Sequence, residues 1–306
     1  MADEALERVA VIGLGSMGLG VATTIIGAGF RVAGYDPAAT ALTRFADAGG
    51  TAASHPAEAA RDAGIVVVVV VNALQTEAVL FGADGAMAAM RRGGVVLSSA
   101  TMAPADARRL AQLCEAAGVS YLDAPISGGA AKAACGELTV MASGHPDAFD
   151  RAKPVLDAIA AKVYRLGDEA GIGASFKMVN QLLAGVHIAA ACEAITFAKR
   201  LGLDIDKVFE VITASAGNSW MFENRIPHVL AGDYRPASAV DIFAKDLGIV
   251  ANMGLAEKFP TPLAASALQL FLMTSAAGMG RDDDASVARM IARMTGLELP
   301  GMTDQA

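Results

Sequence analysis

The stretch Val9-Ala10-Val11-Ile12-Gly13-Leu14-Gly15-Ser16-Met17-Gly18 places the pattern G-x-G-x-x-G directly after a predicted strand and before a predicted helix. Gly13 permits a tight turn, Gly15 lets the backbone approach a pyrophosphate, and Gly18 lets the helix pack closely on the strand. Backbone N–H groups at the start of such a helix bind phosphate oxygens. We therefore predict a dinucleotide-binding turn formed by Gly13, Leu14, Gly15, Ser16, Met17 and Gly18.

An acidic residue ends the next predicted strand, in Gly34-Tyr35-Asp36-Pro37. Asp36 lies 18 residues beyond Gly18, close to the usual offset of about 20. Its carboxylate is expected to accept hydrogen bonds from the adenosine ribose and to repel a 2′-phosphate, which favours NAD over NADP. Alternatively, Asp36 only begins the turn into the next helix, as Asp-Pro often does.

Outward from this motif, the first half of the chain alternates β-branched runs with Ala-rich stretches. Runs without polar alternation predict parallel strands covered on both faces by crossover helices. From about Gly171 the strands stop and apolar residues recur at helical spacing. We predict a Rossmann-type doubly wound parallel sheet over residues 1–170 and an all-helical domain over residues 171–306. The expected strands are Arg8–Ile12, Arg31–Tyr35, Ile65–Val71, Gly94–Leu97, Ser120–Leu122, Leu138–Ala142 and Lys162–Arg165.

The helical half opens with a long predicted helix, from about Gly173 to Arg200. At 1.5 Å per residue it is about 42 Å long, enough to connect two domains and line the cleft between them. Its small and apolar composition predicts burial nearly all round, as in the core of a homodimer or homotetramer. A monomer whose own chain wraps this helix is the alternative.

Composition limits the class of protein. The chain has 306 residues, 54% hydrophobic and 18% charged, and at about 150 residues per domain we expect two domains. The longest purely apolar run, Ile65–Val71, is far shorter than the roughly 20 residues of a membrane-spanning helix. Because Met1–Arg8 lacks the features of a secretion signal, we predict a cytoplasmic protein with no membrane partner.

Charge and cysteine usage argue against further classes of partner. Lys and Arg number 24 against 32 Asp and Glu, a net charge of −8, and no basic run suggests nucleic acid binding. The cysteines, Cys114, Cys135 and Cys192, lack C-x-x-C spacing. We expect buried thiols in a reducing compartment rather than disulfides, and no metal site.

Polar residues follow three of the predicted strands, in the segments Asn72–Gln75, Ser98–Thr101 and Asp123–Gly129. In a doubly wound sheet, ligands bind beyond the carboxyl ends of the strands. Hydroxyl groups with Gly-Gly backbone amides can hold a carboxylate, which makes Ser127, Gly128 and Gly129 a candidate substrate cradle. For Asn72 and Thr101, a helix cap is as good an explanation as a ligand contact.

A lysine is the strongest candidate for proton transfer. Oxidation of an alcohol needs a group that takes the hydroxyl proton, commonly His, Lys or Tyr. The four histidines lie in apparent loops, in a polar segment or in the apolar long helix, and are weaker candidates. Lys177 lies in the first turns of the long helix, and Asn180 and Gln181 share its face at i+3 and i+4. Desolvation there is expected to lower the pKa of Lys177 toward neutrality. The alternative is a surface lysine whose stem packs on the helix end.

Taken together, these motifs resemble the β-hydroxyacid dehydrogenase family, which includes 3-hydroxyisobutyrate dehydrogenase and tartronate semialdehyde reductase. The resemblance covers nearly the whole chain and rests on Gly13–Gly18, Asp123–Gly129, Gly171-x-Gly173 with Lys177, and Lys245-Asp246-Leu247, in family order and spacing. It implies that Lys177 is the catalytic acid/base and that Ser127, Gly128 and Gly129 bind the substrate carboxylate. It also implies that Thr101 and Lys245 contact the cofactor, NAD.

Two positions depart from the family pattern. The residue four after the lysine is Gln181 where the family usually has Asn, and the usual Asp-Met-Ser-Thr stretch reads Ser98-Ser99-Ala100-Thr101. The roles of Gln181 and of Asp246 are left open. Lys245 can also be explained by an exposed i,i+4 pair with Asp241.

Within the family, the segments Asn180–His187, Ser219–Arg225 and Ala239–Ile242 resemble the branch that oxidises a small sugar acid at C2 with NAD. The residues themselves indicate only a hydroxy acid. A reductase acting on an aldehyde acid would use the same groups in reverse. A related imine reductase is disfavoured because that branch lacks the lysine, and the non-enzymatic alternative is a dinucleotide-binding sensor.

Overall fold

The computed structural model describes residues 8–302 of the chain. It divides into two compact units, Met1–Lys177 and Met178–Ala306. The division falls inside the long helix α8 (Ile172–Arg200), so this helix contributes residues to both units.

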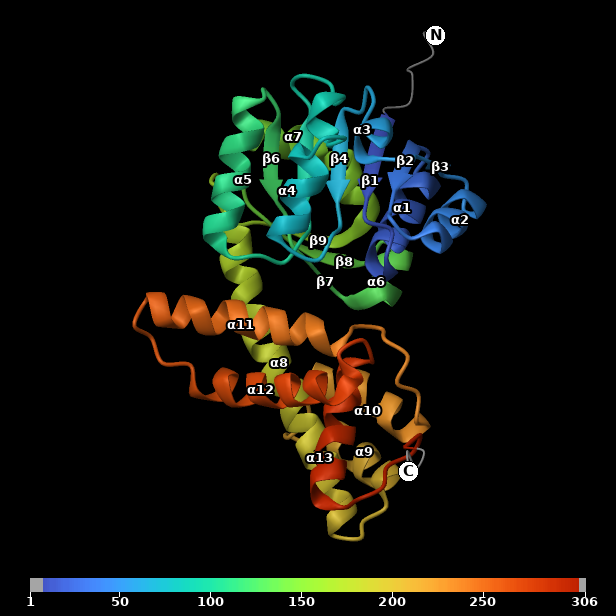
Figure 1. Ribbon diagram of the computed structural model, residues 1–306, viewed down its shortest axis with the longest axis vertical. Helices are drawn as coiled ribbons and strands as arrows, with labels where there is room; N and C mark the ends of the chain where they lie inside the picture. The colour runs from blue at the N-terminus through green and yellow to red at the C-terminus, as the bar shows by residue number, and fades with distance from the viewer. Residues whose placement is uncertain (1–7, 303–306) are drawn as a thin grey trace. The chain divides into compact units, whose positions relative to one another are not determined.

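The first unit is built on a six-stranded sheet with the order β3-β2-β1-β4-β5-β6 (Figure 1). Every adjacent pair in it is parallel. The chain builds the sheet outward from β1, first to one side through β2 and β3 and then to the other through β4, β5 and β6. This is the arrangement of a Rossmann-type doubly wound domain. The predicted fold class is confirmed. The strands are β1 (Arg8–Ile12), β2 (Arg31–Tyr35), β3 (Thr51–Ala52), β4 (Ile65–Val68), β5 (Val95–Ser98) and β6 (Ser120–Asp123).

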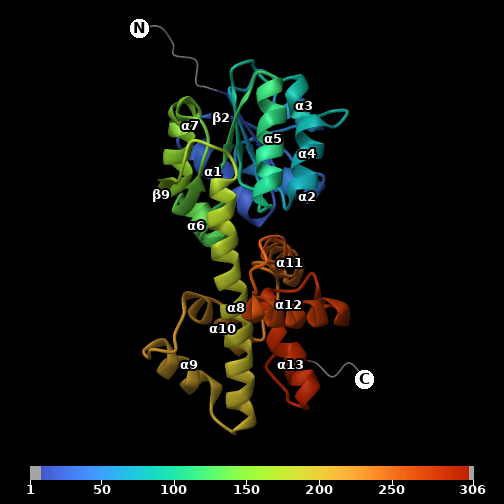
Figure 2. The same ribbon diagram turned by 90° about the vertical axis from the view of Figure 1, so that its left-hand side faces the viewer.

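Helices cover both faces of this sheet (Figure 2). In β1, Val9 and Val11 pack into one core with helices α1 and α7, while Ala10 and Ile12 pack into another with α4 and α5. A strand with two dry faces needs no polar alternation, which explains the continuous apolar runs. The helices of this unit are α1 (Ser16–Gly27), α2 (Ala39–Asp47), α3 (Pro56–Ala59), α4 (Ala73–Phe81), η1 (Ala86–Ala88), α5 (Pro104–Ala116), α6 (Gly129–Cys135) and α7 (Pro146–Ile159).

A second, three-stranded sheet holds the strands that follow β6. Its order is β7 (Ile126–Ser127), β8 (Leu138–Ala142) and β9 (Ala160–Arg165), with β7 and β8 antiparallel and β8 and β9 parallel. The last two predicted strands therefore exist but lie outside the main sheet. Strand-forming sequence does not specify which sheet a strand joins, because that depends on long-range pairing.

The apolar run Ile65–Val71 forms a shorter strand than predicted, since β4 ends at Val68. The chain leaves the sheet there to pass over the glycine turn. A Cβ atom on Gly13 would lie 2.5 Å from the carbonyl oxygen of Val69, so this backbone crossing requires glycine. Gly13 also has a φ of +91°, which a residue with a side chain rarely adopts.

Helices are the regular elements of the second unit's described part, joined by turns and one isolated β-bridge between Ala239 and Asp283, which confirms the predicted class. Its core gathers Ile188 and Ile195 of α8, Phe243 and Leu247 of α11, and Phe271 of α12. Besides α8, its elements are α9 (Ile205–Thr213), α10 (Trp220–Ala231), α11 (Val240–Ala256), α12 (Pro262–Thr274), η2 (Ser275–Met279), η3 (Asp284–Ser286) and α13 (Val287–Thr295).

Helix α8 is not buried all round, contrary to the expectation from its composition. One apolar stripe, formed by Val179, Leu183, Phe197 and Leu201 just beyond the helix end, is 49–64% exposed. The spacing of these residues follows the helical repeat, so they share one side of the helix. We call this set the α8 stripe.

Two helical segments of the described chain are apolar enough and long enough to cross a membrane, by length and composition alone: α8 and Pro262–Met279. Neither contains a long purely apolar run, because charged and polar residues interrupt α8 and uncharged polar residues interrupt Pro262–Met279. Core helices of soluble proteins pass the same test, so this is weak evidence for a membrane span.

The cysteines lie in two kinds of environment. Cys114 and Cys192 are buried as expected, and burial raises the pKa of Cys114 to about 12 and that of Cys192 further. Cys135, in contrast, is exposed near the end of α6, so the expectation of a buried thiol is wrong there.

Candidate active site

The glycine turn leaves open space at the start of α1. A Cβ atom on Gly18 would lie 1.8 Å from the carbonyl oxygen of Gly13, whereas one on Gly15 would meet nothing within 4 Å. Gly15 is the N-cap of α1, and no side chain caps this helix end. Exposed backbone N–H groups beside a residue without a side chain suit a pyrophosphate. The residues present therefore fit a dinucleotide.

Asp36 connects the glycine turn to the end of β2. One carboxylate oxygen, Oδ2, accepts a hydrogen bond from Leu14 N (2.8 Å), and Oδ1 accepts one from Ala38 N (2.8 Å). The second bond is the local turn that the alternative reading predicted. The first spans 22 residues and fixes the acid beside the turn. Each oxygen keeps a further lone pair with which to bind a ribose hydroxyl.

Asn72 and Thr101 follow β4 and β5 in the same sheet. Asn72 caps α4, where its Oδ1 accepts a hydrogen bond from Gln75 N at 2.9 Å. This is the helix-cap role that the sequence left open. Thr101 lies half-buried just before α5. Cofactor contacts by these two residues stay predictions.

Ser127, Gly128 and Gly129 form the connection from β7 to α6. Gly128 and Gly129 have φ values of +136° and +77°, a region that favours glycine. A Cβ atom on Gly129 would meet nothing within 4 Å, so its backbone is open to a ligand, as at Gly15. This geometry is compatible with the predicted carboxylate cradle.

Lys177 lies against this cradle within the first unit. Its side chain is buried, with 7% exposed, and Nζ donates a hydrogen bond to the carbonyl oxygen of Ile126 at 2.8 Å. Ile126 directly precedes Ser127. The alternative of a surface lysine at a helix end is therefore wrong, because the ammonium group points into the protein beside the predicted substrate loop.

A buried acid, Asp123, holds the start of α8 in place. Its Oδ2 accepts hydrogen bonds from Gly171 N (2.9 Å) and Ala174 N (2.8 Å). Ser143 Oγ accepts another from Gly173 N at 2.9 Å. Burial raises the pKa of Asp123 to about 6 despite these donors. In the sequence, Asp123 was part of the motif Asp123–Gly129, but no separate role was predicted for it.

The predicted polar residues of the second unit form one chain of contacts. Asn180 Nδ2 donates to Gln181 Oε1 at 2.9 Å, and Gln181 Nε2 donates to Asp246 Oδ2. Lys245 Nζ lies 2.8 Å from Asp246 Oδ1. Gln181 and Asp246 are the two members whose roles were left open, and for Asp246 the neighbouring Lys245 was the sequence signal.

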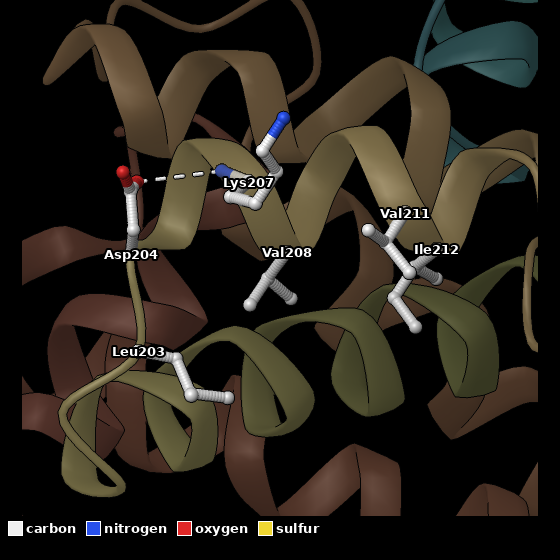
Figure 3. Close-up of a pocket in the computed structure, with 6 residues that line it drawn as sticks. All are labelled: Leu203, Asp204, Lys207, Val208, Val211 and Ile212. Carbon is white, nitrogen blue, oxygen red and sulfur yellow. Dashed lines mark hydrogen bonds between the residues drawn. The ribbon is translucent and has the colours of Figure 1, made fainter.

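A hollow elsewhere on the second unit is lined mainly by apolar side chains (Figure 3). It measures about 380 Å³ and is bordered by α9 and the turn before it. None of the predicted site residues lines it. The lining residues are Leu203, Asp204, Lys207, Val208, Val211 and Ile212. Among residues 8–302, no group of three or more His, Cys, Asp or Glu could hold a metal ion.

Two family models match the chain. Residues 8–167 match the NAD binding domain of 6-phosphogluconate dehydrogenase, and residues 171–291 match the model described as NAD-binding of NADP-dependent 3-hydroxyisobutyrate dehydrogenase. The two matches meet close to the start of α8.

Relatives match the chain over nearly its full length. An L-threonate dehydrogenase from Cupriavidus necator is 54% identical, covering 97% of this chain and 99% of the relative. One from Escherichia coli is 48% identical, covering 96% and 97%. A crystal structure described as 3-hydroxyisobutyrate dehydrogenase from Salmonella typhimurium is 49% identical, with a TM-score of 0.89 over 93% of this chain and 99% of that one.

Proposed function

Since the chain belongs to the 3-hydroxyisobutyrate dehydrogenase family of NAD-dependent oxidoreductases, we propose that it oxidises L-threonate at C2 to 2-dehydro-L-erythronate, with NAD as the cofactor. The relatives named L-threonate dehydrogenase support this substrate. The segments Asn180–His187 and Ser219–Arg225, which resemble that branch of the family, support it further.

One observation carries the proposal: the buried Lys177 ammonium binds the carbonyl oxygen of Ile126, one residue before Ser127. A carboxylate bound by the Ser127 hydroxyl and the backbone of Gly128 and Gly129 would place the C2 hydroxyl group close to Nζ. In its neutral form, Lys177 accepts the hydroxyl proton as the carbonyl forms. NAD, when bound, is the group that accepts the hydride.

The other predicted residues divide between cofactor and substrate. The turn Gly13–Gly18 would hold the pyrophosphate, and Asp36 the adenosine ribose. Asn72, Thr101 and Lys245 would contact the cofactor. Asn180 and Gln181 would face the substrate hydroxyl groups. Because the Asp36 carboxylate repels a 2′-phosphate, NAD is preferred over NADP.

The substrate is tested by following NADH formation from NAD with L-threonate, beside D-threonate, D-erythronate, 3-hydroxyisobutyrate, D-glycerate and 4-hydroxybutyrate, and again with NADP. The highest kcat/KM is expected for L-threonate with NAD. Faster reduction of tartronate semialdehyde would instead favour the reductase. Turnover of none of these acids would favour the dinucleotide-binding sensor.

Lys177→Ala tests the acid/base role. We expect kcat to fall by about 10² to 10⁴, the usual contribution of a general acid/base, while NADH binding measured by fluorescence stays within a factor of two or so. Lys153→Ala, at an exposed lysine of the same unit, is the matched control and should leave both unchanged. Near-normal turnover by Lys177→Ala would exclude this role.

We also propose a cytoplasmic homodimer or homotetramer that associates through the second unit. The exposed α8 stripe supports this, because large apolar side chains gathered on one exposed helix side often mark an interface. The apolar hollow beside α9 adds exposed apolar surface to the second unit. Its lining residue Leu203 lies two residues after Leu201, the last residue of the α8 stripe.

A further inference from the structure

A buried carboxylate on α11 is not explained by the proposed chemistry. Asp246 is 1% exposed, in a helix whose neighbouring residues Phe243 and Leu247 belong to the core. Burying a carboxylate costs several kcal/mol unless partners compensate it. Apolar residues often replace buried ion pairs without loss of stability. A fold that needed only packing at this position would have no use for the charge.

Both oxygens of this carboxylate have partners, and the partners differ in kind. Oδ1 lies 2.8 Å from the ammonium group of Lys245, and Oδ2 accepts a hydrogen bond from the amide of Gln181. These two partners are the residues predicted to face the cofactor and the substrate. A single buried side chain thus links two groups with separate predicted tasks.

The charge of Asp246 also decides how the amides point. A carboxylate only accepts hydrogen bonds, so Gln181 must present Nε2 to it and leave Oε1 for Asn180. Asn180 Nδ2 donates to that oxygen, which leaves Asn180 Oδ1 as an acceptor. The Asp246 carboxylate therefore sets which atoms donate and accept in Gln181 and, through Gln181, in Asn180. The departure from Asn to Gln at position 181 supplies the longer side chain that makes this contact.

We propose that Asp246 is a positioning residue that orients the Gln181 amide and the Lys245 ammonium group together, and thereby couples the substrate-facing amides to cofactor binding. The proposal rests on the proposed function for the tasks of these residues. The coupling itself is a property of binding and can be measured without turnover.

The test is a double-mutant cycle on NADH dissociation, measured by fluorescence, with wild type, Gln181→Met, Asp246→Asn and the double variant. Each single change should weaken NADH binding about tenfold, as expected for losing a hydrogen bond to a charged group. The double variant should be no weaker than Asp246→Asn alone, because Gln181 acts through Asp246. Asp241→Asn, the same change at an exposed acid of α11, should leave NADH binding unchanged.

Two outcomes would overturn the proposal: NADH binding by Asp246→Asn equal to wild type, or single effects that multiply to about a hundredfold in the double variant. If Asp246→Asn does not fold, the cycle of Gln181→Met with Lys245→Met replaces it. Non-additive effects there support the coupling and additive ones refute it. Because NADH binding is the readout, failure of L-threonate as substrate leaves this test intact.

Discussion

Two glycines of one turn differ in what surrounds them. The position that a Cβ on Gly18 would take is occupied by the protein itself, 1.8 Å from the Gly13 carbonyl oxygen, while the corresponding position at Gly15 is open. Gly18 is therefore needed for the turn to form. Gly15 is not needed by the free protein, which indicates that its space belongs to a ligand.

We expect Gly15→Ala to fold with near-normal stability and to lose NADH affinity by at least about tenfold, since the new methyl group blocks the pyrophosphate. Gly18→Ala should destabilise the fold by about 1–3 kcal/mol because the backbone must shift. Urea unfolding and NADH fluorescence titration measure the two effects. Unchanged NADH affinity in Gly15→Ala would contradict this account of the turn.

At the scale of elements, Asp123 joins β6 to the start of α8. Its pKa is raised to about 6, so the folded protein binds this proton more tightly than the unfolded chain does. The contribution of Asp123 to stability is therefore largest below its unfolded pKa and is lost as pH rises through about 6.

Asp123→Asn should remove this part of the pH dependence, which we expect to be on the order of 2 kcal/mol between about pH 4 and pH 7. Urea unfolding at several pH values gives the difference in unfolding free energy between wild type and variant. Asp150→Asn, at an exposed carboxylate, serves as the control. A difference that stays constant across this range would show that Asp123 keeps its ordinary pKa.

Helix α10 is tied to η3 by a second titrating pair. His228 Nδ1 lies 2.9 Å from Asp283 Oδ1, and this contact raises the pKa of His228 above 6.5, against partial desolvation. The pKa of Asp283 is lowered by the same partner and by backbone donors, although its burial opposes this. The charge of Arg225 lowers the pKa of His228, and the charge of Asp284 raises it.

Because the folded pKa is raised, the pair stabilises fully below pH 6.5 and the stabilisation is lost as pH rises through the folded value. The stability advantage of wild type over His228→Gln should thus be largest in mildly acidic buffer and shrink toward alkaline pH. The substitution Asp283→Asn should return the pKa of His228 toward 6.5, and NMR titration of the ring measures this value. An unchanged titration curve would refute the pairing.

At the scale of the whole molecule, the proposed association through the α8 stripe can be tested. Phe197, 62% exposed, lies within it. We expect Phe197→Glu to lower the oligomer mass measured by light scattering, because a carboxylate would have to be buried unpaired in the interface. Phe197→Leu keeps an apolar side chain and should preserve the mass. An oligomer unaffected by the Glu variant would place the interface elsewhere.

The sequence by itself determined the local features of this protein. The glycine pattern, the apolar runs and the change of period near Gly171 were sufficient for the parallel sheet and the helical second half. They worked because each depends on neighbours in sequence: a turn that only glycine permits, or a strand with two dry faces.

Only the tertiary structure decided which distant groups meet. Nothing near Lys177 in sequence shows that its ammonium group binds Ile126 O, 51 residues away, and Asp246 meets Gln181 across 65 residues. The same holds for the departure of β8 and β9 from the main sheet and for the exposed side of α8. Composition sets whether a residue can be buried, but long-range packing sets what covers it.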